Sequence, residues 1–162
     1  MMRLKVTKKV RDNSRIPETL IPDDGPDPAD AVNERPFILS SDRDRATRTM
    51  MRHQINGKTF RHGRIDETVP FGQTEIWTIR NENNFSHPIH LHATHFRVLS
   101  RTGGRNQVMP WERGLKDTVL IHPKEEVKVA VKFTAHPGLF LLHCHNLEHE
   151  DTGMMLNIMV EA

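Results

Sequence analysis

The sequence has little of what marks several large classes of protein. It holds one cysteine, Cys144, so no disulfide can form within the chain, and cysteine usage does not indicate a redox compartment. Its longest apolar run, residues 138–142, is far shorter than the ~20 residues that cross a bilayer, and its net charge of +2 includes no basic stripe. We therefore predict neither a membrane partner nor a nucleic-acid partner.

Other signals of particular functions are also missing. The sequence has no internal repeat, no glycine-rich phosphate loop and no G-x-S-x-G motif. The first ten residues lack the apolar stretch and the small-residue cleavage site of a signal peptide, so we expect any export signal to be absent or to lie outside this chain. The sequence does not indicate where the protein is located.

The first 35 residues differ in composition from the rest of the chain. Residues 2–7 alternate apolar and polar side chains, as a half-buried strand does. Residues 8–35 hold four prolines and a dense acidic patch, which is typical of a linker, with a short helical turn expected at 27–35. Because a lone strand and a linker cannot form a core, we expect residues 1–35 to be the end of a preceding domain.

From residue 36 onward, short β-like runs alternate with turn signals, and we expect residues 36–162 to form one domain. Eight such runs are present, at 36–40, 48–55, 74–81, 87–100, 118–122, 126–134, 138–144 and 154–162. Many short strands with little helix predict an all-β fold, an antiparallel Greek-key sandwich or barrel.

Six of the eleven histidines lie in two short stretches, "HPIHLH" at 87–92 and "HCHNLEH" at 143–149. Side chains on a strand alternate between its two faces, so His87 faces away from His90 and His92. By the same rule, Cys144 faces away from the histidines on either side of it. The pattern therefore predicts two sets of candidate metal ligands, back to back across one pair of strands.

The first set contains Cys144, His87, His149 and a methionine. Two imidazoles, a thiolate and a weak thioether are the ligands of blue-copper electron-transfer sites. Met154 shares its face of the last strand with apolar residues, whereas Met155 shares its face with polar ones. We therefore predict that Met154, not Met155, completes this set.

The second set contains only imidazoles, from His90, His92, His143 and His145. Such a set suits zinc, copper or iron, so its chemistry alone does not identify the metal. Two of its members are covalent neighbours of Cys144. An electron that reaches a copper on Cys144 could therefore pass through a few bonds to metals on the flanking histidines. Such an electron-transfer path is typical of an enzyme that delivers single electrons to a multi-metal centre.

The motifs "HPIHLH" and "HCHNLEHEDTGMM" resemble the two C-terminal copper motifs of the multicopper oxidases, which include bacterial laccases, cuprous oxidases and bilirubin oxidases. The segments "INGKTF", "RIDETVPFGQTEIWTIRN" and "KDTVLIHP" are also similar to the last cupredoxin domain of that family, so the resemblance covers residues 36–162. It implies a cupredoxin-like Greek-key β-sandwich or barrel. It also implies copper cofactors and a small one-electron donor with dioxygen as substrates of the complete enzyme. Members of this family are mostly periplasmic or extracellular.

The resemblance implies a role for each candidate ligand. Four residues match the ligands of type 1 copper, namely His87, Cys144, His149 and Met154. His90 matches a type 2 ligand, and three histidines match type 3 ligands, namely His92, His143 and His145. Glu150 matches an acidic residue that helps to deliver protons during dioxygen reduction, a step that consumes protons.

The sequence departs from the family in one respect. A complete oxidase needs twice as many histidines around its trinuclear cluster, and its first domain supplies the other half through two His-x-His motifs. Residues 1–86 contain only His53 and His62, which do not form such a pair. We therefore expect a complete type 1 site and half of the type 2 and type 3 sites. Missing N-terminal cupredoxin domains or other subunits would be the partners, and oxidase turnover by the chain alone would be little or none.

Three other interpretations stay open from the sequence. The chain could be an autonomous blue-copper electron carrier, or a homo-oligomer that closes its half-sites between subunits as copper nitrite reductases do. A zinc-binding cupin would explain the histidine pairs but not Cys144 and Met154. Trp111 lies on a loop after the first copper strand and either shapes the approach to type 1 copper or covers the core, while His95 is expected beside the ligands or at the surface.

Overall fold

The computed structural model describes residues 2–18, 24–43 and 51–162, and nearly all of its regular structure is β-strand. The strands are β1 (Ala31–Arg43), β2 (Met51–Ile55), β3 (Glu67–Pro70), β4 (Thr74–Asn81), β5 (His87–Leu91), β6 (Phe96–Thr102), β7 (Leu115–Lys116), β8 (Thr118–Ile121), β9 (Glu126–Lys132), β10 (Gly138–Cys144) and β11 (Met155–Glu161). The helical elements are two 3₁₀ turns, η1 (Pro28–Asp30) and η2 (Pro110–Glu112), and one short helix, α1 (Leu147–Asp151). Within the described residues, no helix is long and apolar enough to span a bilayer.

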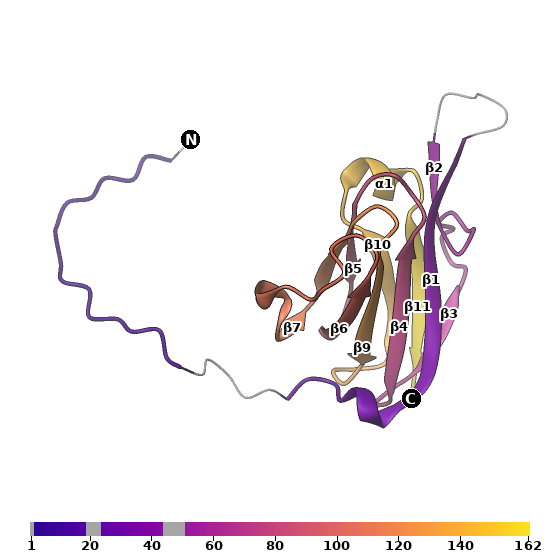
Figure 1. Cartoon of the computed structure of the whole chain (residues 1–162), viewed down its shortest axis with the longest axis horizontal. Coiled ribbons are helices and arrows are strands. Elements are labelled where there is room, and N and C mark those ends of the chain that lie inside the picture. The colour runs from indigo at the N-terminus through magenta and orange to yellow at the C-terminus, as the bar shows by residue number, and fades with distance from the viewer. Residues whose placement is uncertain (1, 19–23, 44–50) are drawn as a thin grey trace.

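The strands form two sheets that lie face to face (Figure 1). One sheet has the order β2-β1-β4-β9-β6-β7, and the other has the order β3-β11-β10-β5-β8. Most neighbouring strands are antiparallel, but β1 runs parallel to β4 and β3 runs parallel to β11. The predicted all-β sandwich is confirmed, whereas the expectation of wholly antiparallel pairing is wrong. The long connections between the strands of each parallel pair allow the chain to return in the same direction.

A single apolar core lies between the sheets. Alternate residues of β9 point into it from one sheet and alternate residues of β11 from the other, including Val127, Val129, Leu156 and Ile158. Burying each such side chain stabilises the fold by about 1.5–3 kcal/mol. Cys144 and Met154 belong to the same buried cluster, so the first set of candidate ligands is built into the wall of the core.

The beginning of the domain differs from the prediction. Strand β1 starts at Ala31, where it pairs with Thr74 of β4, so the expected boundary at residue 36 falls inside a strand. The helical turn expected at 27–35 is the single turn η1, which Asp27 caps by accepting a hydrogen bond from the backbone N–H of Ala29. Residues 31–35 resemble a linker in sequence, but they form part of β1 because they pair in parallel with β4.

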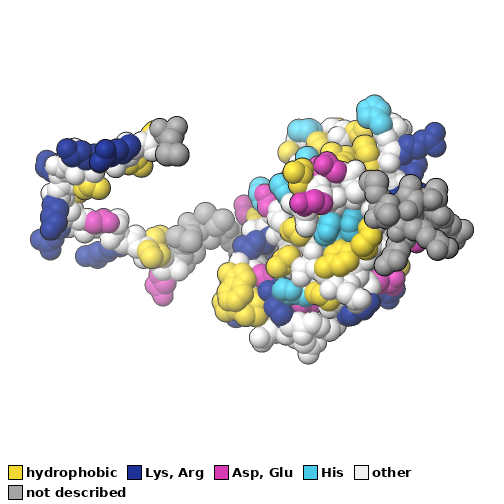
Figure 2. Space-filling view, turned by 90° about the horizontal axis from the view of Figure 1, so that it is seen from above, with side chains coloured by type: hydrophobic (Ala, Val, Ile, Leu, Met, Phe, Trp, Pro, Cys, Tyr) yellow, Lys and Arg dark blue, Asp and Glu magenta, His cyan; other side chains and the backbone are white. Residues whose placement is uncertain are grey.

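Residues 2–18 are exposed and carry no strand, so the strand predicted at 2–7 is wrong for this structure. A strand needs a neighbour for its backbone N–H and C=O groups, and this segment has none among the described residues. Its lysine and arginine side chains stand out along the extended trace (Figure 2). Parts of the predicted linker, at 19–23, and of the predicted strand 48–55, at 48–50, lie outside the described residues.

The run predicted as one strand at 87–100 forms two strands in different sheets. Ala93 between them has a φ of 65°, a left-handed backbone that ends β5 and redirects the chain into β6. The sequence analysis also missed β3 and β7. These strands have four residues and two residues, which is too short for a recognisable alternation.

Candidate metal centres

Three side chains converge at one end of the sandwich, where β5 begins and β10 ends. The Sγ atom of Cys144 lies 3.5 Å from Nδ1 of His87 and 3.6 Å from Nδ1 of His149, and the two nitrogens lie 3.1 Å apart. His87 and Cys144 are fully buried, whereas His149, on α1, is partly exposed. The three residues predicted as one ligand set are therefore brought together by the fold, and we refer to them as the first site.

The size and chemistry of the first site fit a metal ion. A point about 2 Å from each of the three atoms lies at the centre of their triangle, and this is close to the lengths of metal–imidazole and metal–thiolate bonds. Burial lowers the pKa of His87 to about 3 and also lowers the pKa of His149, so both imidazoles are neutral with lone pairs free to bind. Burial raises the pKa of the Cys144 thiol to about 11, so a bound cation is needed to hold the thiolate at neutral pH.

Met154 lies directly beside the first site along the backbone. Its N–H donates to the carbonyl of His149, and its own carbonyl accepts from the N–H of Cys144, both at 3.0 Å. The side chain of Met154 is fully buried, whereas Met155 is partly exposed and pairs with His143 across the sheet. The predicted burial of Met154 is confirmed, and its role as a ligand stays a prediction.

Three side chains that the sequence analysis did not select surround the first site. The amide of Asn83 lies 2.9 Å from Nε2 of His87, the nitrogen that faces away from the trio. The ring of Phe85 packs against the rings of His87 and His149, with centroids 5.1 and 5.3 Å apart. The ring of His53, on β2, lies closer still to His149, at 4.1 Å. No local motif marks these residues, because strand pairing and a loop bring them to the site.

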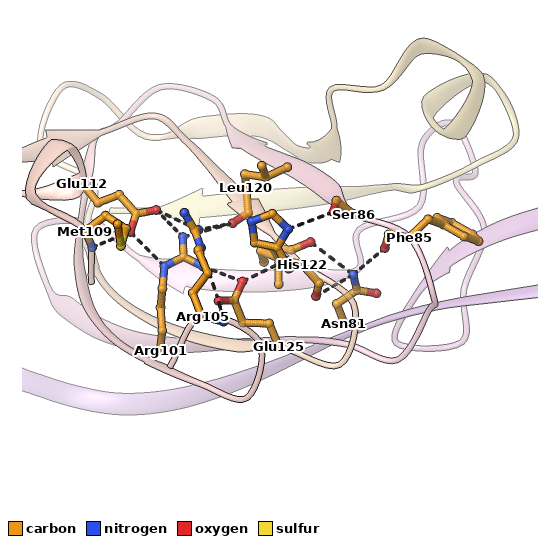
Figure 3. A network of polar contacts seen from close by, with 11 residues as sticks. Asn81, Phe85, Ser86, Arg101, Arg105, Met109, Glu112, Leu120, His122 and Glu125 are labelled. Carbon is orange, nitrogen blue, oxygen red and sulfur yellow. Dashed lines mark hydrogen bonds and ion pairs between the residues drawn. The ribbon is translucent and has the colours of Figure 1, made fainter. Parts of the chain in front are cut away.

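The loop that carries Asn83 and Phe85 is anchored by hydrogen bonds to Asn81, a buried residue at the end of β4 (Figure 3). The side-chain amide nitrogen of Asn81 lies 2.8 Å from the carbonyl oxygen of Phe85 and 3.1 Å from that of His122. The side-chain oxygen of Asn81 accepts a hydrogen bond from the backbone N–H of Asn83 at 2.9 Å. Asn81 therefore fixes the loop between β4 and β5 at both Asn83 and Phe85, just before His87.

A buried ion-pair network continues from this loop (Figure 3). Glu125 accepts a hydrogen bond from the backbone N–H of His122 at 2.8 Å and pairs with the guanidinium of Arg101 at 2.7 Å. The same guanidinium also pairs with Glu112 of η2. Removing one partner of such a buried pair costs about 3–5 kcal/mol because the remaining charge is left uncompensated. The network therefore ties η2 and β6 to the turn that carries His122 and Glu125, and Asn81 connects this turn to the loop before β5.

The second set of histidines gathers on the opposite face of β5 and β10, as the alternation predicts. His143 pairs with His90 across the strands, and Nε2 of His143 lies 3.0 Å from Nε2 of His92. One nitrogen of each of these three side chains lies within 4.8 Å of the others, so they could hold a metal ion. The ring of His145 lies 5.4 Å from the ring of His143, but its side chain is exposed. We refer to these four histidines as the second site.

Hydrogen bonds orient the members of the second site. Nδ1 of His90 lies 2.9 Å from the carbonyl oxygen of Asp117, which leaves Nε2 free. Nδ1 of His143 lies 3.1 Å from the carbonyl oxygen of Cys144 and 3.2 Å from a carboxylate oxygen of Glu150. Metal-bound histidines usually donate their other ring N–H to such oxygens. The structure thus places Glu150 against the second site, although it follows His149 of the first site in the sequence.

The second site lies at the edge of the protein. His90 and His92 line a cavity of about 700 Å³ together with residues 24–27 and Asp117. The second site therefore faces open space on one side, whereas the first site is enclosed.

The remaining candidates lie away from both sites or at the surface. Trp111 is 66% exposed and lines a small pocket with Lys116 and Leu120, and no first-site ligand lines that pocket. His95 is exposed at the rim of the large cavity, and Nδ1 of His122 lies 3.2 Å from the hydroxyl of Ser86. The expectation that His95 lies beside the ligands or at the surface is confirmed.

Comparisons with known proteins agree with this geometry. A family model described as multicopper oxidase matches residues 31–162. A bilirubin oxidase from Albifimbria verrucaria is 45% identical over 106 residues, which is 62% of this chain and 18% of that protein. A laccase from Haloferax volcanii is 38% identical over 168 residues, 94% of this chain and 28% of that protein.

Solved structures give the same result. A multicopper oxidase from Campylobacter jejuni, described as a metallo-oxidase, superposes with a TM-score of 0.76 at 30% identity, over 93% of this chain and 34% of that chain. A variant of the McoA multicopper oxidase from Aquifex aeolicus superposes with a TM-score of 0.80, also at 30% identity, over 93% of this chain and 34% of that chain. The chain therefore spans about a third or less of the length of these relatives.

Proposed function

Because the chain belongs to the multicopper oxidase family and has its cupredoxin-like fold, we propose that it is the domain of such an oxidase that binds type 1 copper and accepts electrons. In this proposal, the type 1 ligands are His87, Cys144, His149 and Met154. The observation that carries it is the triangle of one thiol and two neutral imidazoles in the core wall, with a buried methionine adjoining it. Zinc also accepts such ligands, but the thioether and the trigonal set favour copper.

The residues of the first site would have different roles in holding the metal and transferring electrons. His87 and Cys144 are enclosed, so they exclude water from the metal and hold its geometry. His149 is the partly exposed member, and an electron donor would approach at its edge. Bound copper would supply a one-electron couple. Cys144 would then lead the electron through the backbone to His143 and His145, its direct neighbours on the opposite face.

The second site supports a proposal about the complete enzyme. We assign His90 to type 2 copper and His92, His143 and His145 to type 3 copper. Two of them, His90 and His92, line the open cavity, so the remaining ligands would come from another cupredoxin domain or another subunit on that side. In that assembly, small one-electron donors would be oxidised and dioxygen reduced to water. Glu150, which is partly exposed and contacts His143, would relay the protons that this reduction consumes.

All of the ligands proposed for the first site come from one chain, which also favours a second candidate function, an autonomous blue-copper electron carrier. Both candidates predict that a monomer binds one copper tightly and shows a strong sulfur-to-copper charge-transfer colour. They differ in what the second site does when a partner polypeptide supplies further histidines. The carrier would bind no additional copper in the presence of such a partner.

The test is to load the chain with copper and to measure copper per chain, visible absorption, mass by light scattering and dioxygen uptake with a phenolic electron donor. We expect one tightly held, coloured copper per monomer and no uptake. Robust dioxygen uptake by the monomer would overturn the proposal that the second site needs ligands from another domain or subunit. An oligomer with more than one tightly held copper per chain would instead support ligands shared between subunits.

A further inference from the structure

His53 is a buried histidine next to the first site that the proposed copper chemistry does not use. It lies on β2, far from the ligand motifs in the sequence, and only 6% of its surface is exposed. Its ring is 4.1 Å from the ring of His149, with an angle of 37° between the ring planes. This is the shortest of the ring contacts around His149, so His53 is the aromatic group best placed to fix that imidazole.

The orientation of His149 depends on ring contacts more than that of the other candidate ligands. Nε2 of His87 has the amide of Asn83 at 2.9 Å, and Nδ1 of His90 has the carbonyl oxygen of Asp117. Among the described residues, the Nε2 atom of His149 has no such hydrogen-bonding partner. His149 also lies on α1, which is only five residues long and is held by a few backbone hydrogen bonds. Apart from the contacts of its Nδ1 atom within the first site, the His149 ring is therefore restrained by the packed rings of His53, His87 and Phe85, of which His53 is the nearest.

His53 is itself fixed by strand pairing. Ser41 of β1 lies directly opposite His53 of β2 in the antiparallel register, and its hydroxyl is 2.8 Å from Nδ1 of His53. The hydrogen bond holds the plane of the His53 ring, because rotation about the side chain would break it. A chain of contacts thus leads from β1 through His53 to the exposed edge of the first site.

We propose that His53 is a positioning residue for the metal: its stacked ring, held by Ser41, keeps the His149 imidazole in the orientation that presents Nδ1 to the ion. This inference rests on the proposed function, because it assigns His149 as a ligand. His53 does more than fill space in the core, since an apolar side chain of similar size would fill the same space but would have no hydrogen bond to fix the plane of its ring. The ring plane, not the buried volume, is the feature that matters.

The test compares four variants of the full chain, H53L, H53F, S41A and the control H62L, which replaces an exposed histidine elsewhere. Copper affinity is measured by chelator competition, the charge-transfer band and the electron paramagnetic resonance spectrum are recorded, and the metal-free chains are melted to check their fold. Loss of a group that orients a ligand typically weakens metal binding by about 10- to 100-fold, so we expect at least about a 10-fold loss and an altered spectrum in H53L. H53F keeps a ring but loses the hydrogen bond to Ser41, so it should recover only part of the affinity, and its spectrum should lie between those of H53L and the wild type.

Each outcome decides a different question. If wild-type protein takes up no coloured copper, the proposed function fails and this inference fails with it. If wild-type protein is coloured and H53L matches H62L in affinity and spectrum, only this inference is overturned. If H53L does not fold, S41A decides, because it keeps the His53 ring and removes only the hydrogen bond that fixes its plane. The inference then requires S41A to bind copper more weakly than H62L and to show an altered spectrum. An S41A protein that matches H62L in affinity and spectrum overturns it.

Discussion

The first and second sites occupy opposite faces of the same two strands, β5 and β10, but their surroundings differ. His87 and Cys144 of the first site are fully buried in the wall of the core. In the second site, His145 is exposed, and His90 and His92 line an open cavity. One step along the backbone, from Cys144 to His145, therefore leads from the interior to the surface, whereas His143 on the other side is also buried.

This difference explains how one short motif can serve two sites. Strand geometry alone separates the faces, since neighbouring side chains point in opposite directions. The sandwich then makes one face dry and enclosed and leaves the other available to a partner. Under the proposed function, a metal on the first site would need only ligands from this chain, whereas a metal cluster on the second site would need ligands from elsewhere.

The largest expected effect comes from removing the sulfur of the first site in C144S. The variant should lose the charge-transfer colour completely and bind copper more than about 100-fold more weakly, because losing a ligand costs more than losing a group that orients one. Absorption spectroscopy and chelator competition measure both effects. Zinc binding at the second site, followed by calorimetry, should be unchanged; if it also disappears, the two sites are not independent.

The converse variant, H90A/H92A, tests the second site without touching the first. We expect the weaker second metal-binding event in a zinc titration to disappear, because the remaining histidines are too few to hold an ion. The colour and copper affinity of the first site should match those of the wild type. A loss of colour in this variant would show that the second face supports the first more strongly than the structure indicates.

Acid should destabilise the metal-free chain through two buried histidines, His87 of the first site and His53 beside it. Burial lowers the pKa of His87 to about 3 and of His53 to about 4, whereas unfolded histidine titrates near its ordinary value. The folded state thus binds fewer protons, so the stabilisation is complete above the unfolded pKa and declines as the pH falls below it, towards the folded values. By pH 5 the loss is about 2 kcal/mol for each histidine. Urea unfolding at pH 7 and pH 5 measures it, and H53F should lose about half as much; an equal loss in both proteins would contradict the assignment.

The ligands themselves could be predicted because they depend on local geometry. His87, His90 and His92 lie within one strand and its first turn, and a period of two assigns their faces with no knowledge of the rest of the fold. The same holds for the two histidines beside Cys144. The separation of Met154 from Met155 could also be predicted, since the apolar residues that follow mark the buried face of β11.

The surroundings of the sites could not be predicted in this way. His53 reaches His149 because β2 pairs with β1, and a single histidine in "RHQI" gives no local signal of that pairing. Glu150 contacts His143 only because α1 turns the chain back towards the strands. The start of β1 was also missed, because its parallel pairing with β4 is a contact between segments about forty residues apart. Long-range pairing thus decides which groups orient the ligands and tune their chemistry.

The smallest expected effect comes from M154L, and it addresses how far the first site depends on its buried methionine. Leucine has nearly the same volume, so the fold should lose less than about 1.5 kcal/mol and copper should still bind. Electron donation by an axial ligand of any kind stabilises the more highly charged, oxidised ion, so replacing the thioether by an apolar side chain should raise the reduction potential. A redox titration of the copper-loaded chain measures the change, with M155L as the matched control, because Met155 faces the other way and pairs with His143. If both variants shift the potential equally, Met154 acts through packing and is not a ligand.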